Sequence, residues 1–371
     1  MKFTCEKFLL LNAINISSRA ASPKSVVPAL EGLLIEAAGD IKVSGYDLKT
    51  GIRTSFPADI EEAGSIVLNS RLFGDIVRKL PEDVISVSVD KNLMTTIECG
   101  MSKFNIIGID SSDYPELPAV ESQNVVEIKQ SVLKSMISQT NFAVSDNETR
   151  PIHTGSLFEV GGDVLTIVSV DGYRLALRRE EIEKKQVDKY SFVVPGAALA
   201  EVEKILRDSD DNVKIILGNK HITFAIDETV LISRRLEGEF LNYKQAVPMD
   251  GQFSVMADRK ALATCIERVS LIVSDRLKSP VRCRFENNLF KVTTATALGK
   301  AYDECEVEGD CEGLEIGFNN KYLLDALRAA PAEKVLIKLS SPVSPCVILP
   351  ADESTNFVYM ILPVRIRANE N

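Results

Sequence analysis

One motif occurs three times in this chain, at intervals close to a third of its length. The copies run from Val67 to Leu80, from Val193 to Leu206 and from Ile316 to Ala330. Each copy starts with a strand-like apolar pair and continues into a short amphipathic helix. The apolar residues at one shared register are Phe73, Leu199 and Leu323, and two positions later come the acids Asp75, Glu201 and Asp325. A repeat of this spacing predicts three tandem domains of one architecture.

The segments around the motif repeat as well. Each third opens with a strand that leads into a helix, and Phe8, Leu133 and Leu262 are predicted to correspond in these openings. A hairpin follows, with predicted turns at Gly39-Asp40, at Gly161-Gly162-Asp163 and at Asn287-Asn288. A second hairpin closes each third. Two helices and roughly eight strands per domain predict an α+β fold in which a sheet layer carries two helices on one side.

The predicted domain boundaries fall in two polar, proline-flanked stretches, at Ala119 to Asn124 and at Pro248 to Gln252. The domains are therefore expected to span residues 1–122, 123–250 and 251–371. No run of about 18 apolar residues occurs, which argues against a membrane span. Charged and polar residues interrupt the N-terminal apolar stretch, so no signal peptide is predicted and a cytoplasmic location is expected.

The sequence contains little that suggests catalysis. The seven cysteines are scattered without a CxxC pair, so reduced core thiols are expected rather than a metal site. The only two histidines are His153 and His221, and neither lies in a catalytic or metal-binding motif. No phosphate-binding glycine loop is present, so no cofactor is predicted. A binding protein is favoured over an enzyme. Two alternatives remain open: a hydrolase that uses His153 and the Asp171 loop, and a scaffold with no role on DNA.

Basic residues suggest a partner despite the net charge of −10. Many of them, Lys7 among them, lie on the predicted helices. If those helices share one face, an acidic protein would present a basic surface that attracts phosphate backbones without reading sequence. Aromatic residues do not alternate with these cations, so stacking on single-stranded nucleic acid is not predicted.

Several short motifs, in this order and at this length, resemble those of the bacterial DNA polymerase III beta subunits, the sliding clamps. They are Pro28-Ala-Leu-Glu-Gly-Leu-Leu34, Asp113-Tyr-Pro-Glu-Leu117, Glu148-Thr-Arg-Pro151, Asp171-Gly-Tyr-Arg-Leu-Ala176, Phe318-Asn-Asn-Lys-Tyr-Leu323 and Leu362-Pro-Val-Arg-Ile366. The resemblance covers the whole chain.

This resemblance implies a non-enzymatic processivity factor. It implies three clamp domains per chain and a head-to-tail homodimer that closes into a pseudo-sixfold ring around duplex DNA. It also implies sliding contacts with DNA at Lys24, Arg71, Arg150, Arg276 and Lys278. The implied partners are the replicative polymerase alpha subunit, the clamp loader, and other polymerases and repair proteins that carry clamp-binding motifs.

The resemblance further implies a hydrophobic pocket for partner peptides and a dimer interface. The implied pocket residues are His153, Val170, Gly172, Tyr173, Arg174, Leu175, Leu241, Gln245, Ala246, Met360, Leu362, Pro363, Val364 and Arg365. The implied interface residues are Phe104, Ile106, Ile272 and Val273. Three pocket positions depart from the family pattern. His153 replaces an apolar residue, Leu241 replaces a proline and Gln245 replaces an arginine.

Overall fold

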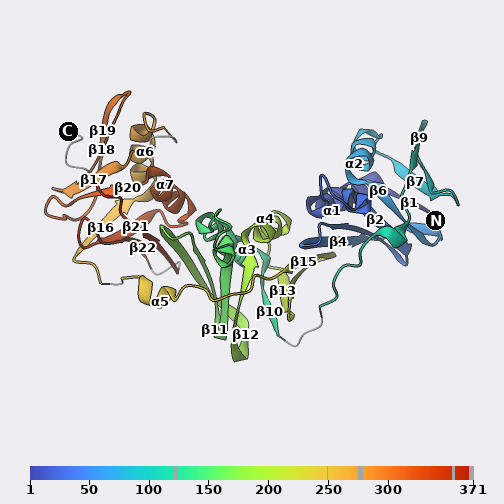
Figure 1. Cartoon of the computed structure of the whole chain (residues 1–371), viewed down its shortest axis with the longest axis horizontal. Coiled ribbons are helices and arrows are strands. Elements are labelled where there is room, and N and C mark those ends of the chain that lie inside the picture. The colour runs from blue at the N-terminus through green and yellow to red at the C-terminus, as the bar shows by residue number, and fades with distance from the viewer. Residues whose placement is uncertain (121–123, 249, 275–278, 353–355, 367–371) are drawn as a thin grey trace. The chain divides into compact units, whose positions relative to one another are not determined.

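The computed structural model describes residues 1–120, 124–248, 250–274, 279–352 and 356–366, without the side chains of residues 183–188. Figure 1 shows the helices and strands of the chain, which its internal contacts divide into two compact units. The first unit comprises Met1–Ser131 with Glu201–Arg235, and the second comprises Val132–Ala200 with Leu236–Asn371. Residues of the predicted middle domain, 123–250, therefore belong to both units.

The first unit contains two antiparallel sheets. One has the order β5 (Asp59–Glu62), β1 (Lys2–Glu6), β7 (Val84–Val89), β8 (Met94–Cys99) and β9 (Ser102–Ile107). The other has the order β10 (Val125–Lys129), β13 (Asn212–Leu217), β14 (His221–Ile226), β15 (Thr229–Arg234), β4 (Thr50–Phe56), β3 (Asp40–Tyr46), β2 (Gly32–Ala38) and β6 (Gly64–Asn69). This second sheet crosses the predicted boundary near residue 122, because β15 pairs with β4. A buried hydrogen bond of 2.9 Å between the Thr54 and Thr229 hydroxyls supports the junction.

The second unit also contains two antiparallel sheets. One has the order β11 (Gly155–Val170), β12 (Arg174–Pro195), β23 (Phe357–Ile361), β22 (Cys346–Pro350), β21 (Lys334–Leu339) and β16 (Phe253–Asp258). The other has the order β19 (Gly299–Glu306), β18 (Leu289–Thr296), β17 (Val281–Glu286) and β20 (Glu315–Phe318). The first of these crosses the predicted boundary near residue 250, because β12 pairs with β23.

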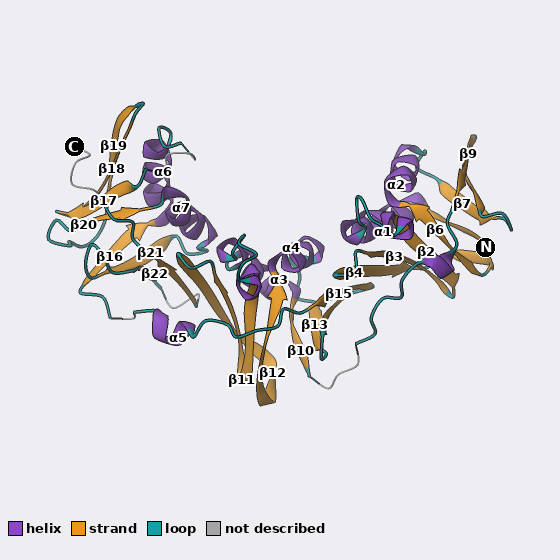
Figure 2. Cartoon of the chain, viewed as in Figure 1, coloured by secondary structure: helices purple, strands orange, loops and turns teal. Residues whose placement is uncertain are grey.

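The helices confirm the repeated motif (Figure 2). They are α1 (Lys7–Ser17), α2 (Ser70–Lys79), α3 (Gln130–Ser138), α4 (Gly196–Ile205), α5 (Tyr243–Ala246), α6 (Arg259–Ser270) and α7 (Asn320–Ala329). Short 3-10 helices lie at Ser18–Ala20, Pro28–Glu31, Ser111–Asp113, Asn141–Ala143 and Pro151–Thr154. Side-chain oxygens cap the starts of α2 and α7, where Asn69 accepts from the amide of Leu72 and Asn319 from that of Lys321, both at 3.0 Å.

The aligned apolar residues of the repeated helices lie in the core. Phe73 and Leu199 are fully buried and Leu323 is nearly so. In the first unit, α1 packs against α2 and both contribute to a core with β1, β2 and β7. In the second, α6 packs against α7. No helix in the described part of the chain is long and apolar enough to cross a membrane.

Two predictions from the repeat were wrong. Phe8 does not correspond to Leu133 and Leu262, since its side chain is 70% exposed while theirs are buried. The equivalent core residue is Leu10, three positions after the first residue of α1, as Leu133 and Leu262 are in their own helices. The first helix therefore starts two residues later than the alignment with Phe8 assumed.

The predicted turn at Gly161-Gly162-Asp163 is a bulge inside β11. The strand continues to Val170, and the register with β12 shifts on both sides of Gly162. Gly162 takes a φ of +66°, which glycine tolerates at a bulge as readily as in a turn. The hairpin turn lies instead at residues 171–173. The predicted turn at Asn287-Asn288 is confirmed, with φ values of +54° and +60°.

Candidate functional site

Apolar side chains gather on one face of the six-stranded sheet, beside α5. We call this group the α5 cluster. Its buried members are Leu157, Val168, Val170, Leu175, Leu177, Val193, Tyr243, Val347 and Met360, and Ile152, Leu236, Phe240, Val247, Leu349, Val358 and Leu362 pack around them. Leu175 and Leu177 face the cluster, whereas Ala176 between them belongs to the core on the opposite face. Successive side chains of β12 thus point alternately to the α5 cluster and to the core on the other face of the sheet.

Exposed apolar side chains border the α5 cluster. Tyr173 is 61% exposed, Leu241 44% and Val364 39%. The Leu362 amide donates to the Tyr173 carbonyl at 2.8 Å, which ties the hairpin turn to the segment after β23. Gly172 allows this turn, because its φ is +90°. A buried apolar cluster with exposed apolar neighbours suits the anchoring side chains of a short peptide.

The structure brings four predicted pocket residues into the α5 cluster: Val170, Leu175, Met360 and Leu362. The others lie at its edge or beyond. His153 meets Phe240, which packs against the cluster, edge to face at a ring distance of 5.5 Å. Burial, and to a lesser extent Arg150, lowers the pKa of His153, so its ring is neutral at pH 7. Gln245 and Ala246 belong to α5, and Pro363 and Arg365 follow β23.

Arg174 faces the opposite side of the sheet from the α5 cluster. Its guanidinium donates to Asp171 at 2.9 Å, to Asp325 on α7 at 2.6 Å and to the Phe142 carbonyl at 2.6 Å. It also lies over the Tyr322 ring, 4.5 Å from the centroid. Next to it is a cavity of about 590 Å³. The guanidinium is therefore already bound within the second unit, and the neighbouring Tyr173 ring stacks on the Tyr322 ring, with their centroids 6.1 Å apart, beside the same cavity.

Several cluster residues were missed from the sequence, Tyr243 above all. Its ring is buried in the cluster and its hydroxyl donates to Glu159. The sequence does contain a pattern that includes Tyr243. Each third of the chain ends with an aromatic residue four or five positions before a proline. These aromatics are Tyr114, Tyr243 and Tyr359, and all three are buried. The pattern was visible in the sequence, but it did not indicate that Tyr243 packs in the α5 cluster.

The residues predicted to contact DNA are Lys24, Arg71, Arg150, Arg276 and Lys278. The last two lie outside the described residues. Lys24, Arg71 and Arg150 are all exposed, Arg71 in the first turn of α2 and the other two in loops. None of these three forms an ion pair with another described residue, whereas Arg78 on α2 pairs with Asp75 at 2.8 Å. Their charges are thus available to an anionic partner.

Lys7 was predicted to belong to this basic helix surface, and that was wrong. Its side chain is 6% exposed, and its ammonium donates to the Leu80 carbonyl and to Glu82 at 2.7 and 2.6 Å. It caps the end of α2, where a cation suits the helix dipole.

The four predicted interface residues lie near open sheet edges or follow a helix. Phe104 and Ile106 are on β9, the edge strand of the five-stranded sheet. Phe104 is 39% exposed and Ile106 is half-buried. Ile272 and Val273 are half-buried and follow α6, which packs on the edge strand β19. An edge strand carries unpaired backbone groups that can bind another strand.

The thiols and acids provide no sign of metal chemistry. In the described ranges, no group of three or more His, Cys, Asp or Glu side chains is arranged to hold a metal ion. All seven cysteines are free. Burial is the main cause that raises the pKa of Cys5 and Cys346 to about 12, which keeps these thiols protonated and unreactive.

Comparison with known proteins gives one consistent result. The chain matches three family models of the DNA polymerase III beta subunit: the N-terminal domain over residues 1–118, the central domain over 127–242 and the C-terminal domain over 244–365. It is 32% identical to the beta sliding clamp of Halalkalibacterium halodurans, over 98% of this chain and 100% of that protein.

Solved structures agree. The DNA polymerase sliding clamp from Bacillus subtilis superposes with a TM-score of 0.94 at 31% identity, covering 99% of this chain and 100% of that one. A griselimycin-bound sliding clamp from Pseudomonas aeruginosa gives a TM-score of 0.94 at 28% identity, with the same coverage. The chain belongs to the bacterial beta sliding clamps, the beta subunits of DNA polymerase III, which are processivity factors on DNA and not enzymes.

Proposed function

We propose that two copies of this chain close head to tail into a ring around duplex DNA and tether the replicative polymerase to it. The strand pairing within the chain carries this proposal. The last strand of the middle domain, β15, pairs with the fourth strand of the first domain, β4. The last strand of the third domain, β23, pairs with β12, which has the corresponding place in the middle domain. Two strands of these kinds are not used in the two pairings. They are β9, the last strand of the first domain, and β19, the fourth strand of the third domain.

Both β9 and β19 are sheet edges. If the last strand of one domain again pairs with the fourth strand of its neighbour, β9 of one copy would join β19 of the next. Two such joints close a dimer, since each chain supplies one edge of each kind. We propose domain limits of 1–122, 123–250 and 251–371, so that the ring holds six domains.

The intramolecular joints also predict the register of this contact. In β4, Gly51 is the first residue that pairs with the preceding strand, β3. In β12, Leu175 is the first residue that pairs with the preceding strand, β11. Three residues beyond them, Thr54 and Arg178 face the first residues of β15 and β23.

The corresponding residue of β19 is Gly299, so Ser102 should face Tyr302. Phe104 should then face Lys300, and Ile106 should face Leu298. Leu298 and Tyr302 are 77% and 58% exposed, so the contact would cover apolar surface on both edges. Ile272 and Val273, which follow α6, would pack behind β19.

DNA would pass through the ring without sequence recognition. Lys24, Arg71 and Arg150, together with Arg276 and Lys278, would make salt-screened phosphate contacts. Such contacts are weak and exchange quickly, as sliding requires. The ring itself, and not affinity, would keep the protein on DNA.

Partner proteins would dock on the α5 cluster. The replicative polymerase alpha subunit, the clamp loader, and other polymerases and repair proteins would each insert a short apolar motif beside Leu175, Met360 and Leu362. The relative crystallised with griselimycin supports a ligand-binding surface in this family. We place this activity in the cytoplasm, where the replicating chromosome of a bacterium lies.

The ring proposal is tested by topology. The protein is loaded on a nicked circular plasmid with a clamp loader and separated from free protein by gel filtration. It should remain bound to circles and be lost when a restriction enzyme linearises the plasmid. Retention on linear DNA with free ends would contradict encirclement and indicate ordinary phosphate binding.

A further inference from the structure

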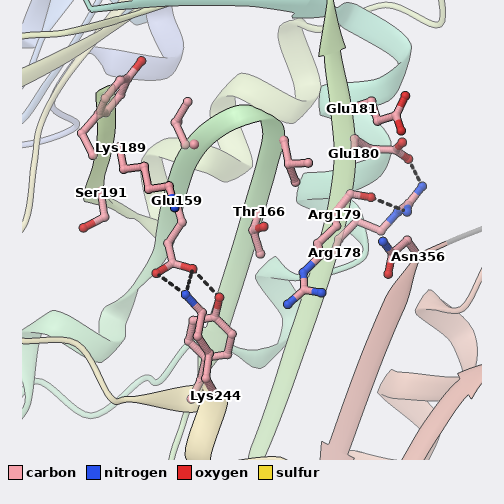
Figure 3. A pocket seen from close by; sticks show the side chains of 15 residues that line it. Glu159, Thr166, Arg178, Arg179, Glu180, Glu181, Lys189, Ser191, Lys244 and Asn356 are labelled. Atoms are coloured by element: carbon pink, nitrogen blue, oxygen red, sulfur yellow. Dashed lines mark hydrogen bonds and ion pairs between the residues drawn. The ribbon is translucent and has the colours of Figure 1, made fainter. Parts of the chain in front are cut away.

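The β11–β12 hairpin and α5 border a second cavity. A cavity of about 820 Å³ opens between the two halves of the β11–β12 hairpin and α5 (Figure 3). Its walls include Glu159 from β11, Arg179 and Lys189 from β12, and Lys244 from α5. The bulge at Gly162 divides the hairpin into the two halves that face the cavity.

Most of the carboxylates in the cavity already have partners. Glu159 accepts from the Tyr243 hydroxyl and pairs with Lys244 at 3.2 Å (Figure 3). Glu180 pairs with the Arg178 guanidinium. These contacts neutralise Glu159 and Glu180, and Glu181 is the remaining carboxylate of the lining.

Two cations in the walls have no such partner. Neither Arg179 nor Lys189 forms an ion pair with a residue that the structure describes, and both side chains are exposed. Arg179 also lies close enough to the Tyr243 hydroxyl to donate a hydrogen bond to it. The Lys189 stem lies over Gly161, where an added Cβ would come within 3.1 Å of its Cγ. The Arg179 amide donates to the Asn356 carbonyl at 3.0 Å. The two charged groups are therefore accessible to an anion from solvent.

Two further polar groups of the lining are incompletely bonded. The Arg178 Nε and the Tyr190 hydroxyl are buried and have no hydrogen-bond partner among the described residues. Only 6% of the Arg178 surface is exposed. Buried donors without partners are uncommon in folded proteins and often mark a position where a ligand or water completes the bonding.

We propose that this cavity binds a small molecule through an oxyanion group, a phosphate or a carboxylate. Arg179 and Lys189 would supply the charge, and a small rotation of the Tyr190 side chain would add its hydroxyl. Charge-assisted hydrogen bonds from arginine and lysine suit such groups. The volume is that of a small-molecule site rather than of a protein interface.

The test is equilibrium binding of inorganic phosphate to the full-length protein at constant ionic strength. We expect saturable binding of one phosphate per chain at millimolar concentrations. Lys189→Ala or Arg179→Ala should weaken it about tenfold, since each removes a charged hydrogen bond. Tyr190→Phe should weaken it too, without lowering stability, because the lost hydroxyl has no protein partner. Lys220→Ala, an exposed lysine in the β13–β14 turn, is the matched control and should bind as the parent does.

The outcomes separate clearly. Displacement of phosphate by citrate would assign the site to oxyanions in general, and failure of citrate to compete would assign it to phosphates. Binding that does not saturate, or that falls equally in the Lys220 and Lys189 variants, would mean diffuse attraction to surface charge and overturn the proposal. No binding at millimolar phosphate would overturn it as well.

Discussion

Removing the Arg174 guanidinium should loosen α7 from the sheet. The side chain is 9% exposed, and its partners Asp171 and Asp325 are 11% and 22% exposed. Arg174→Ala would leave both carboxylates in a mostly buried site without their cation. Breaking a buried ion pair from one side costs about 3–5 kcal/mol. The lost contact with the Tyr322 ring is part of the same change and is not added separately.

Hydrogen exchange of the α7 amides measures this effect locally. A loss of about 3–5 kcal/mol corresponds to opening that is more frequent by roughly two to four powers of ten. Asp325→Asn should cost about 1–2 kcal/mol, because the amide oxygen still accepts one hydrogen bond. Arg328→Ala on the same helix is the control. Its pair with Glu267 is 59% and 43% exposed and should contribute less than about 1 kcal/mol. Equal effects of the Arg174 and Arg328 variants would refute the reasoning.

The dimer contact, the α5 cluster and a buried thiol can each be tested by substitution. Aspartates at both Ile272 and Val273 should give a folded monomer by sedimentation, and a dimer that persists would exclude these residues from the interface. Leu362→Asp should weaken binding of a partner peptide by roughly tenfold or more in fluorescence polarisation, since it places a charge in the α5 cluster, whereas unchanged affinity would place the docking surface elsewhere. Cys346 has a pKa raised by burial from 9.0 to about 12. The contribution of this thiol to the free energy of unfolding should therefore be complete below pH 9 and decline as the pH rises towards 12. In denaturant titrations, the free energy of unfolding of Cys346→Ala should fall less steeply over this pH range.

The repeat predicted much of the fold because each copy satisfies the same local physics. The apolar register of Phe73, Leu199 and Leu323 fixes which face of each helix is buried, and the structure confirms it. The acids two positions later were equally visible, but their roles differ. Asp75 pairs with Arg78 on its own helix, whereas Asp325 reaches Arg174 on a distant strand. The spacing of apolar residues along a helix determines which of its side chains are buried. The ion pair that a charged side chain forms depends on residues elsewhere in the fold.

Other features could not be read from local pattern. Gly162 satisfies the backbone requirements of a turn and of a bulge alike, and only the pairing of β11 with β12 decides between them. The cross-boundary pairs β15–β4 and β12–β23 are contacts between segments far apart in the sequence. The orientation of Arg174 depended on Asp325 and Phe142, which lie in other segments of the chain. For these reasons the sequence indicated an apolar docking surface but not which way each side chain faces.

Electron microscopy of the purified protein tests most directly whether two chains form a closed ring. Projection images should show a ring of six lobes around an open centre, since two chains would supply three domains each. The double aspartate variant at Ile272 and Val273 should show half-rings under the same conditions. A filled particle, or open crescents of the parent protein at every concentration, would contradict the account.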